Sequence, residues 1–402
     1  MHPVDDRERR ARLLTRLHLG PAVQAKRISD AANDLVGLHA SDPMSVYLAA
    51  HARVRKLTTA DVDDALYESR SLIKFIGMRR TMFAVPVDLA GIIDAACSRA
   101  IAVAERKRLH GLLAGAGIAK DPERWLSRVE AETMAVLESR GELTAAELTK
   151  EVPGLRKQII FGEGRKWGGK VGVSTRVLFL LAIDGRIVRA RPRGGITSSL
   201  YRWVPLERWT GRTLPDWSVE GAQIELARRW LSTYGPGAID DLKWWAGWTA
   251  AQTRRAVAGL ETVEVRLDDG RTGIVLADDL ERTPPPPPSL ALLPGLDPAL
   301  MGWANRDFFL GPHRSALFDQ NGNAGPTILW EGWVVGGWAQ RPDGLIAHRF
   351  LEDAGKEAER AVEAAAASLE AFVGPVRFIT RFGTPLDREL QGPRPKPLRR
   401  TS

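Results

Sequence analysis

One pattern occurs three times along this chain of 402 residues: a short helix, a turn, a second helix and then a β-prone ribbon. The clearest copy begins at GELTAAELTKEV, in which Thr144 and Glu147 have the spacing of a capping box at a helix N-terminus. VSTRVLFLLAIDG follows with helical apolar spacing, and RIVRARPRGGITSSLYRWV predicts a strand, a glycine turn and a second strand. This order of elements predicts a winged helix.

Two further segments repeat the order with diverged residues. In GAIDDLKWWAGWTAAQTRRAVAGLETVEVRLDDGRTGIVL, Thr249 is expected to begin the second helix, and Asp269-Gly270 to form the turn between the last two strands. The segment TTADVDDALYESRSLIKFIGMRRTMFAVP is less regular but keeps the order. Three winged helices in tandem are therefore expected.

The C-terminal part of the chain has a different character. Five prolines at 284–288 mark a boundary, because polyproline geometry makes a stiff spacer. After them, PTILWEGWVVGGWAQ alternates apolar and small residues around glycine turns, and an Ala-rich helix at 354–371 follows. The expected domains are residues 1–110 with the N-terminal helices and first winged helix, 111–215 with the second, 216–283 with the third, a Pro-rich linker at 284–289, and a β-rich domain with a basic tail at 290–402. The fold class is thus α+β.

Basic residues exceed acidic ones and gather in three clusters. Lysine and arginine number 57 against 49 acids, which gives a net charge of +8. The clusters lie at 156–170, 186–195 and 394–400, and such clustering is the electrostatic footprint of a protein that binds a phosphate backbone. The predicted DNA-binding residues here are Arg189, Arg191 and Arg193 on the middle wing, with Lys166 and Lys170 in the first cluster.

Composition excludes several other classes of protein. Cys97 is the only cysteine, so disulfides, thiolate zinc sites and iron–sulfur clusters are not expected, and the seven histidines show no metal-ligand spacing. No run of 18 apolar residues and no signal sequence is present. We expect a cytoplasmic monomer that has no membrane partner and uses no metal or other cofactor.

The stretch GLHASDP, residues 37–43, is predicted to connect two helices. Asp42 is expected to cap the second helix, with Pro43 at its first position. In an extended connector, residues two apart face the same way, so His39 and Ser41 can converge on one water molecule while Ala40 packs inward. The positive end of the helix dipole lies beside them.

With these motifs in place, the chain resembles the helix-turn-helix DNA glycosylases of the AlkZ and YcaQ type. VGLHASDPMSVYLAAHARV resembles the active-site segment of that superfamily. FIGMRRTMFAVP lies where the family has a Met-Arg-Gly-Thr-Leu-His type of run, and LALLPGLDPALMGWANRD and NGNAGPTILWEGWVVGGW match its C-terminal part. The resemblance implies three tandem winged helices and a C-terminal β-barrel in a C shape around DNA, with excision of alkylated purines.

The resemblance also assigns the site residues. The family's catalytic motif is Gln-hydrophobic-Gln, or Gln-hydrophobic-Asp in the crosslink branch, and His39 and Ser41 occupy those positions here. Neutral imidazole can accept a hydrogen bond from water as a glutamine carbonyl does, and the serine hydroxyl can complete its orientation. Arg79 and Thr81, in the matching family run, are further candidates for DNA contact; a wing strand with one exposed cation is the alternative interpretation.

Asp297 completes the candidate catalytic set. It precedes Pro298 and is most simply a helix N-cap, while a carboxylate facing the substrate sugar is the alternative. The predicted function is a monofunctional DNA glycosylase for N3- or N7-alkylated purines in duplex DNA, because no lysine stands in the motif to form a Schiff base. The alternative is a winged-helix DNA-binding protein without catalysis, which the replacement of both glutamines favours.

Overall fold

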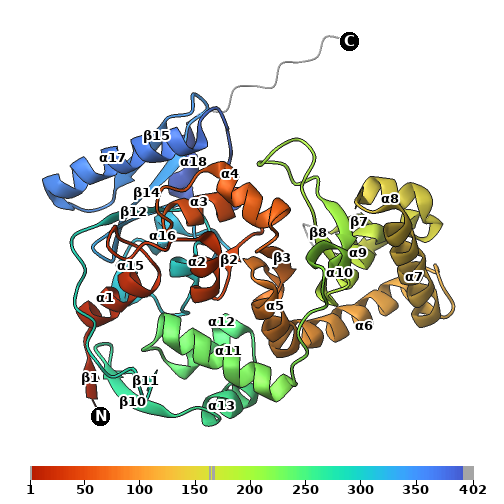
Figure 1. Cartoon of the computed structure of the whole chain (residues 1–402), viewed down its shortest axis with the longest axis horizontal. Coiled ribbons are helices and arrows are strands. Elements are labelled where there is room, and N and C mark those ends of the chain that lie inside the picture. Colours follow the sequence, from red (N-terminus) through yellow and green to blue (C-terminus); the bar gives the residue numbers. More distant parts are fainter. Residues whose placement is uncertain (1, 163, 165–167, 393–402) are drawn as a thin grey trace. The chain divides into compact units, whose positions relative to one another are not determined.

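The computed structural model describes residues 2–162, 164 and 168–392, which form two compact units of mixed α and β structure. The first unit comprises residues 1–62, 229–245 and 260–402, and the second comprises 63–228 and 246–259. Each unit is described by itself below, with the labels of Figure 1. Lys166 and the basic tail at 394–400 lie outside the described residues.

The first unit contains two sheets. In one, β1 (His2–Val4) pairs in parallel with β10 (Thr262–Leu267), which pairs antiparallel with β11 (Thr272–Leu276). Their buried face consists of Val4, Val265, Leu267 and Val275. Gly270 has a φ of +81° between β10 and β11, so the predicted Asp269-Gly270 turn is confirmed.

The other sheet of this unit is antiparallel and has the order β12-β13-β14-β15. Its strands are β12 (Leu290–Leu293), β13 (Thr327–Trp330), β14 (Trp333–Gln340) and β15 (Ile346–Phe350). The described strands do not close into the barrel that the family resemblance implied. The reason is that helices cover the sheet: α17 (Gly355–Val373) packs against both edge strands and α18 (Pro385–Gln391) against β14 (Figure 1).

The helices of the first unit surround a core rich in tryptophan and phenylalanine. Trp303 makes edge contacts with Tyr234, Phe308 and Phe309 at ring-centroid distances of 5.2 to 5.7 Å. The remaining helical and extended elements are α1 (Asp6–Arg16), α2 (Ile28–Asp34), β2 (Leu38–His39), α3 (Ser45–His51), α14 (Pro298–Met301), α15 (Asp307–Leu310) and α16 (Arg314–Leu317); α4 (Thr59–Asp63), α11 (Val219–Tyr234) and α12 (Ile239–Ala246) have residues in both units. The prolines at 284–288 have no regular structure, and both sides of this run belong to the first unit.

The second unit contains the middle helix–turn–helix–ribbon segment with the predicted elements. Thr144 and Glu147 form the capping box at the start of α8 (Ala145–Glu151), and α9 (Val173–Ile183) is the predicted second helix. Strand β9 (Arg202–Pro205) pairs with both β5 (Leu143–Thr144) and β8 (Ile187–Arg189). Between the two helices the sequence did not predict the hairpin of β6 (Gln158–Phe161) and β7 (Gly169–Gly172).

The first and third segments differ in how closely they follow the prediction. Thr249 caps α13 (Ala250–Ala258) as expected, with Gln252 completing a capping box. In the first segment one continuous helical stretch, α4 and then η1 (Asp64–Glu68), leads directly to the hairpin of β3 (Ile73–Ile76) and β4 (Met82–Val85). The expected second helix is replaced by β3, whose four residues are all buried. The other elements of this unit are η2 (Met78–Arg80), α5 (Val87–Ile93), η3 (Asp94–Ser98), α6 (Arg99–Gly115), α7 (Pro122–Arg140), η4 (Pro153–Arg156) and α10 (Leu206–Thr210).

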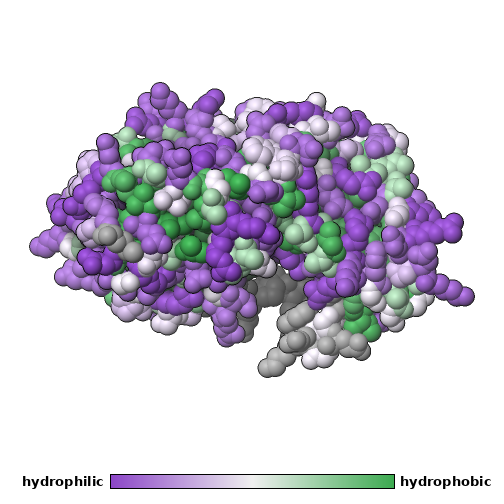
Figure 2. All heavy atoms as spheres, turned by 90° about the horizontal axis from the view of Figure 1, so that it is seen from below, coloured by the Kyte–Doolittle hydropathy of each residue, from purple (hydrophilic) through white to green (hydrophobic). Residues whose placement is uncertain are grey.

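The face drawn in Figure 2 is mostly hydrophilic, with hydrophobic side chains in separate patches. Among the described residues, none of the helices combines the length and apolar character that a membrane span needs.

Candidate active site

The predicted catalytic connector begins at a left-handed turn. Helix α2 ends at Asp34, and Val36 and Gly37 then have φ values of +56° and +109°. The Gly37 amide donates to the Ala32 carbonyl oxygen at 2.8 Å, which closes the helix end. The chain therefore leaves α2 in a fixed direction and enters β2, where His39 is only 7% exposed.

The structure brings His39 and Ser41 into contact through the serine backbone. The Ser41 amide donates to His39 Nδ1 at 3.4 Å, a long hydrogen bond. Because Nδ1 accepts, a neutral His39 ring carries its proton on Nε2. Ala40 is 1% exposed, which confirms that it packs inward, and Ser41 is half-buried.

Arg381, which the sequence did not single out, holds the far end of the connector. Its amide donates to Asp42 Oδ2 at 2.9 Å and its Nη1 donates to the Ser41 carbonyl oxygen at 3.2 Å. The other oxygen of Asp42 accepts from the Met44 amide. Helix α3 begins only at Ser45, so the prediction that Asp42 caps this helix was wrong; its carboxylate closes the turn before the helix.

Behind the connector, α3 leads to a buried ion pair between Arg53 and Asp297. Arg53 Nη1 and Nη2 donate to the two oxygens of Asp297 at 2.9 and 2.6 Å, and both side chains are fully buried. Asp297 also accepts from the Ala299 amide at 2.9 Å, which confirms that it is the N-cap of α14. The sequence signal for Arg53 is weak: an arginine two residues after His51, where α3 ends.

The end of α2 is anchored by α11. Thr233 Oγ1 donates to the Asp34 carbonyl oxygen at 2.6 Å, and the buried Tyr234 hydroxyl donates to the Leu35 carbonyl oxygen at 2.9 Å. Burial raises the pKa of Tyr234, so this hydroxyl keeps its proton. These bonds fix the residues from which the connector starts.

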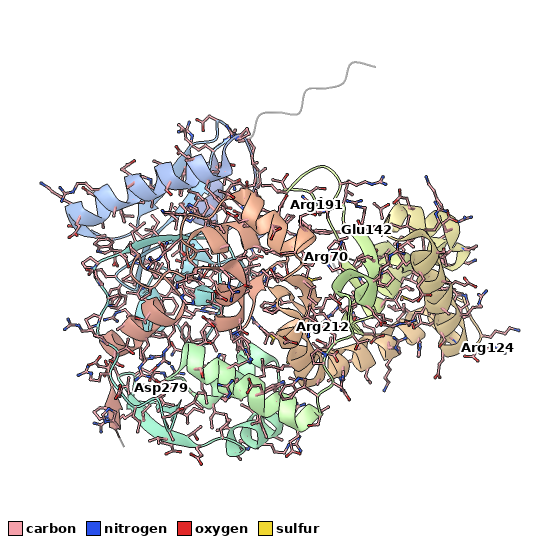
Figure 3. The ribbon with its side chains drawn as sticks, in the orientation of Figure 1. Arg70, Arg124, Glu142, Arg191, Arg212 and Asp279 are labelled. Carbon is pink, nitrogen blue, oxygen red and sulfur yellow. The ribbon has the colours of Figure 1, made fainter. Side chains whose placement is uncertain are left out.

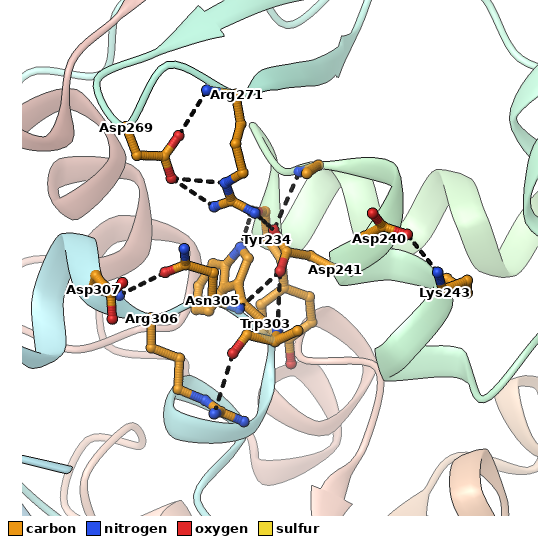
Figure 4. A network of polar contacts seen from close by, with 12 residues as sticks. Tyr234, Asp240, Asp241, Lys243, Asp269, Arg271, Trp303, Asn305, Arg306 and Asp307 are labelled. Carbon is orange, nitrogen blue, oxygen red and sulfur yellow. Dashed lines mark hydrogen bonds and ion pairs between the residues drawn. The ribbon is translucent and has the colours of Figure 1, made fainter. Parts of the chain in front are cut away.

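The segment after α14 is fixed by the network in Figure 4. Asp241 is 1% exposed, and its Oδ1 accepts from the amides of Ala304 and Asn305 at 3.0 and 2.9 Å. Arg271 reaches the other oxygen of Asp241 at 3.3 Å. Asp297 thus lies between two elements that are held in place, the segment of Arg53 and the segment after α14. This arrangement favours a positioning role for Asp297.

The predicted DNA-binding arginines of the wing lie in the second unit, beside acidic and aromatic partners. Arg191, which is labelled in Figure 3, forms ion pairs with Asp63 and Glu68 at 2.6 and 2.9 Å. Arg193 forms an ion pair with Glu147 at 2.6 Å. Arg189 lies with its guanidinium over the rings of Tyr201 and Trp203. Lys170, on β7 of the neighbouring hairpin, is exposed.

Arg79 and Thr81 lie at the turn between β3 and β4. Arg79 and the adjacent Arg80 have φ values of +52° and +63°, in the left-handed region that favours glycine. Holding a residue with a side chain there costs about 1 to 2 kcal/mol. Arg80 stands where the family run has glycine, and it forms an ion pair with Glu105 at 2.9 Å. Burial lowers the pKa of Arg79.

Lys74 on β3 is a buried cation that the sequence did not reveal. It is 4% exposed, and its Nζ donates to the Tyr67 hydroxyl at 2.8 Å and lies 4.7 Å from the ring of Tyr201. Burial, together with the charge of Arg189, lowers its pKa to about 7. Within the described residues no cluster of three histidine, cysteine, aspartate or glutamate side chains is placed to hold a metal ion.

The fold is similar to that of a solved DNA glycosylase. The Streptomyces sahachiroi DNA glycosylase AlkZ matches with a TM-score of 0.72 and 21% sequence identity, over 94% of this chain and 98% of that chain. The chain belongs to the AlkZ-like DNA glycosylase family, whose model, described as "DNA glycosylase AlkZ-like", matches residues 32–372. No curated protein sequence matches it.

Proposed function

We propose that this DNA glycosylase hydrolyses the N-glycosidic bond of N3- or N7-alkylated purines in duplex DNA. Bulky genotoxin adducts and crosslinks are included in the substrate class, and the context is base-excision repair or self-resistance. The observation that carries the proposal is that the connector is held at both ends, by α11 where it starts and by Arg381 at Ser41 and Asp42. By the family resemblance, His39 and Ser41 on this connector stand at the catalytic positions. Preorganised groups of this kind can orient a water molecule.

The proposed reaction needs little acid catalysis. An alkylated purine of this class is already cationic, so the bond from C1′ to the base nitrogen breaks with its electron pair going to the base. A water oxygen bonds to C1′, and its proton passes to a nearby acceptor. The unprotonated nitrogen of neutral His39 is Nδ1, which accepts the long 3.4 Å bond from the Ser41 amide, so the water must displace that bond to reach it. The Ser41 hydroxyl can help to orient the water. A protonated His39 would oppose the positive charge that develops on the sugar.

DNA binding is proposed to follow the family pattern. The capped helices α8 and α13 and the paired strands β8 and β9 support the proposal of three tandem winged helices in a C shape around the duplex. The protein is proposed to be a cytoplasmic monomer. Cleavage of the strand is not expected, because no lysine stands on the connector to form a Schiff base with the sugar.

The decisive experiment measures base release in single turnovers with saturating enzyme, on duplex DNA that carries N7-methylguanine. His39→Ala should lower the rate about a hundredfold or more with little loss of binding, the usual size for a positioned acid–base group. The wild-type rate should fall toward acid pH, where imidazole becomes protonated. His110→Ala, which removes a histidine from α6, is the matched control and should leave the rate unchanged.

Two further variants decide how the site works. His39→Gln combined with Ser41→Gln restores the family's glutamine motif and should preserve or increase the release of simple methylated bases. Full activity in His39→Ala, with activity lost in Asp297→Ala, would mean that His39 is only structural and that the carboxylate acts on the sugar.

The second candidate is a DNA-binding protein without catalysis, either a regulator or a protein that sequesters lesions. The observation that favours it is that both glutamines of the motif are replaced here. Tight binding to damaged duplexes with no release of N3-methyladenine or N7-methylguanine would establish this alternative.

A further inference from the structure

Helices α6 and α9 of the second unit form a pocket that the proposed reaction does not use. The two helices pack against each other in this unit (Figure 1). The pocket between them is small, and its lining residues are Glu105, Arg108, Leu109, Leu112, Arg176, Phe179 and Leu180. Three of these residues are charged and the rest are apolar, so charge converges on a partly apolar recess.

A third arginine reaches the same place from the hairpin turn of β3 and β4. Arg80 Nη1 lies 2.9 Å from Glu105 Oε1, and its guanidinium carbon lies 5.2 Å from the centroid of the Phe179 ring. Arg80 has a φ of +63°, a conformation in which glycine would be unstrained. The chain therefore holds this arginine in place against a backbone preference, and such outliers are often found at functional positions.

The electrostatics of the pocket favour an anion. Among the described residues of this cluster, Arg108, Arg176 and Glu105 line the pocket, and Arg80 forms an ion pair with Glu105, so three guanidinium groups share the place with one carboxylate. Burial lowers the pKa of Arg176; Glu105 raises it, and the nearby charges of Arg80 and Arg108 lower it further. Like charges on three side chains repel one another in a partly desolvated site, and a bound anion would relieve this repulsion.

We propose that Arg80, Arg108 and Arg176 bind a backbone phosphate of DNA, and that Glu105 is their counterion in the free protein. This inference rests on the proposed function in so far as the partner is DNA. Arginine matches the geometry of a phosphate because its planar group donates two parallel hydrogen bonds. The small recess has no room for a base and sugar, so the ligand is a phosphate group at its mouth rather than a whole nucleotide.

The test is the salt dependence of binding to an undamaged duplex, measured by fluorescence anisotropy from about 50 to about 300 mM salt. Arg80→Gly should weaken binding severalfold at the lower salt and reduce the slope of log K against log salt by about one, since one phosphate contact is lost. Its melting temperature should stay the same or rise, because glycine relieves the strained backbone. A purely structural arginine would lower the melting temperature when removed.

Glu105→Gln gives the opposite change and makes the test sharper. Removing the competing carboxylate should tighten binding about threefold to tenfold at low salt and leave no counterion for the phosphate to displace. Arg124→Ala on α7 is the matched control: it removes one exposed arginine of the same unit, outside the pocket, and should not alter the slope as Arg80→Gly does.

Three results would overturn the assignment. One is that Arg80→Gly and Arg108→Ala change the slope no more than Arg124→Ala does. Another is that Glu105→Gln does not tighten binding. The third is that inorganic phosphate binds in a calorimetric titration and loses its affinity in Arg80→Gly while the slope for DNA is unchanged; the site would then serve free phosphate. Base release by the wild type is measured separately, so a protein that releases no base but shows the expected slopes would retain this site and lose only the proposed reaction.

Discussion

Each of the two units buries a cation, and the two cations are stabilised in different ways. In the first unit, Arg53 donates to both oxygens of Asp297 with neither side chain exposed. In the second unit, Lys74 is equally buried but donates to the hydroxyl of Tyr67 and lies among aromatic rings, with no carboxylate bonded to it in the described part of the chain. The Lys74 pKa falls to about 7 as a result.

The two sites show that an ionised partner compensates a buried positive charge for its lost hydration better than neutral polar surroundings do. A hydroxyl and two rings replace only part of the hydration that an ammonium loses, whereas a carboxylate with two parallel hydrogen bonds compensates for most of that of a guanidinium. The pair in the first unit can therefore act as a permanent positioning device, while Lys74 changes its charge near neutral pH.

The largest effect is expected from removing half of the buried pair. Arg53→Ala should lower the free energy of unfolding by about 3 to 5 kcal/mol, because Asp297 is left as an uncompensated buried charge. Urea unfolding followed by circular dichroism measures this loss. The double variant Arg53→Met with Asp297→Leu should recover most of it, because no unpaired charge remains. A loss below 1 kcal/mol in Arg53→Ala would show that the pair behaves like an exposed one.

Lys74→Met should raise the free energy of unfolding, whereas Arg53→Ala lowers it. The folded pKa of about 7 lies below the ordinary value of 10.5, so between these two values the unfolded chain binds a proton that the folded protein does not. Stability should therefore rise with pH across this window, and the buried ammonium should be most unfavourable below pH 7. Lys74→Met should stabilise the protein there by on the order of 1 to 3 kcal/mol and remove the rise. Lys107→Met, an exposed lysine of α6, should do neither.

His18 in the first unit should have a smaller effect on stability than Lys74, and this effect should fall rather than rise with pH. Its Nδ1 lies 2.8 Å from the Val23 carbonyl oxygen and its Nε2 lies 3.0 Å from Asp34 Oδ2, so both nitrogens can donate only when the ring is cationic. The hydrogen bond to Asp34 raises the pKa of His18 above 6.5. The contribution of this ion pair to the free energy of unfolding is fully present below pH 6.5. It is lost as the pH rises through the raised pKa of His18 in the folded protein.

His18→Ala should therefore cost about 1 kcal/mol or less at pH 6, because Asp34 is half exposed and water screens the pair, and should cost less still at pH 8. Thermal unfolding at the two pH values measures the difference, with His110→Ala as the control. A cost that grows toward pH 8 would contradict the assignment of a cationic ring.

The sequence predicted local structure where the signal lies within a few residues. The capping box at Thr144, the helix start at Thr249, the helix at α9 and the turn at Gly270 are all confirmed. The Asp42 cap was wrong because α3 begins only at Ser45; the Asp42 carboxylate closes the turn before it and also accepts from the Arg381 amide, 339 residues away. The closed barrel was not found in the described chain because α17 and α18 cover the sheet, and the packing of an amphipathic helix against strands is not set by the strands' own residues.

By itself the sequence placed His39 and Ser41 on the connector that is proposed to be catalytic, since their positions follow from their neighbours along the chain. It also determined the excess of positive charge that a DNA-binding protein needs. Only the tertiary structure decided that Arg53 meets Asp297 across 244 residues, that Lys74 is buried with a hydroxyl as its hydrogen-bond partner, and that Arg80, Arg108 and Arg176 converge on one recess. The physical reason is that a charge acts through distance and burial, and both are set by the folded chain rather than by spacing along it.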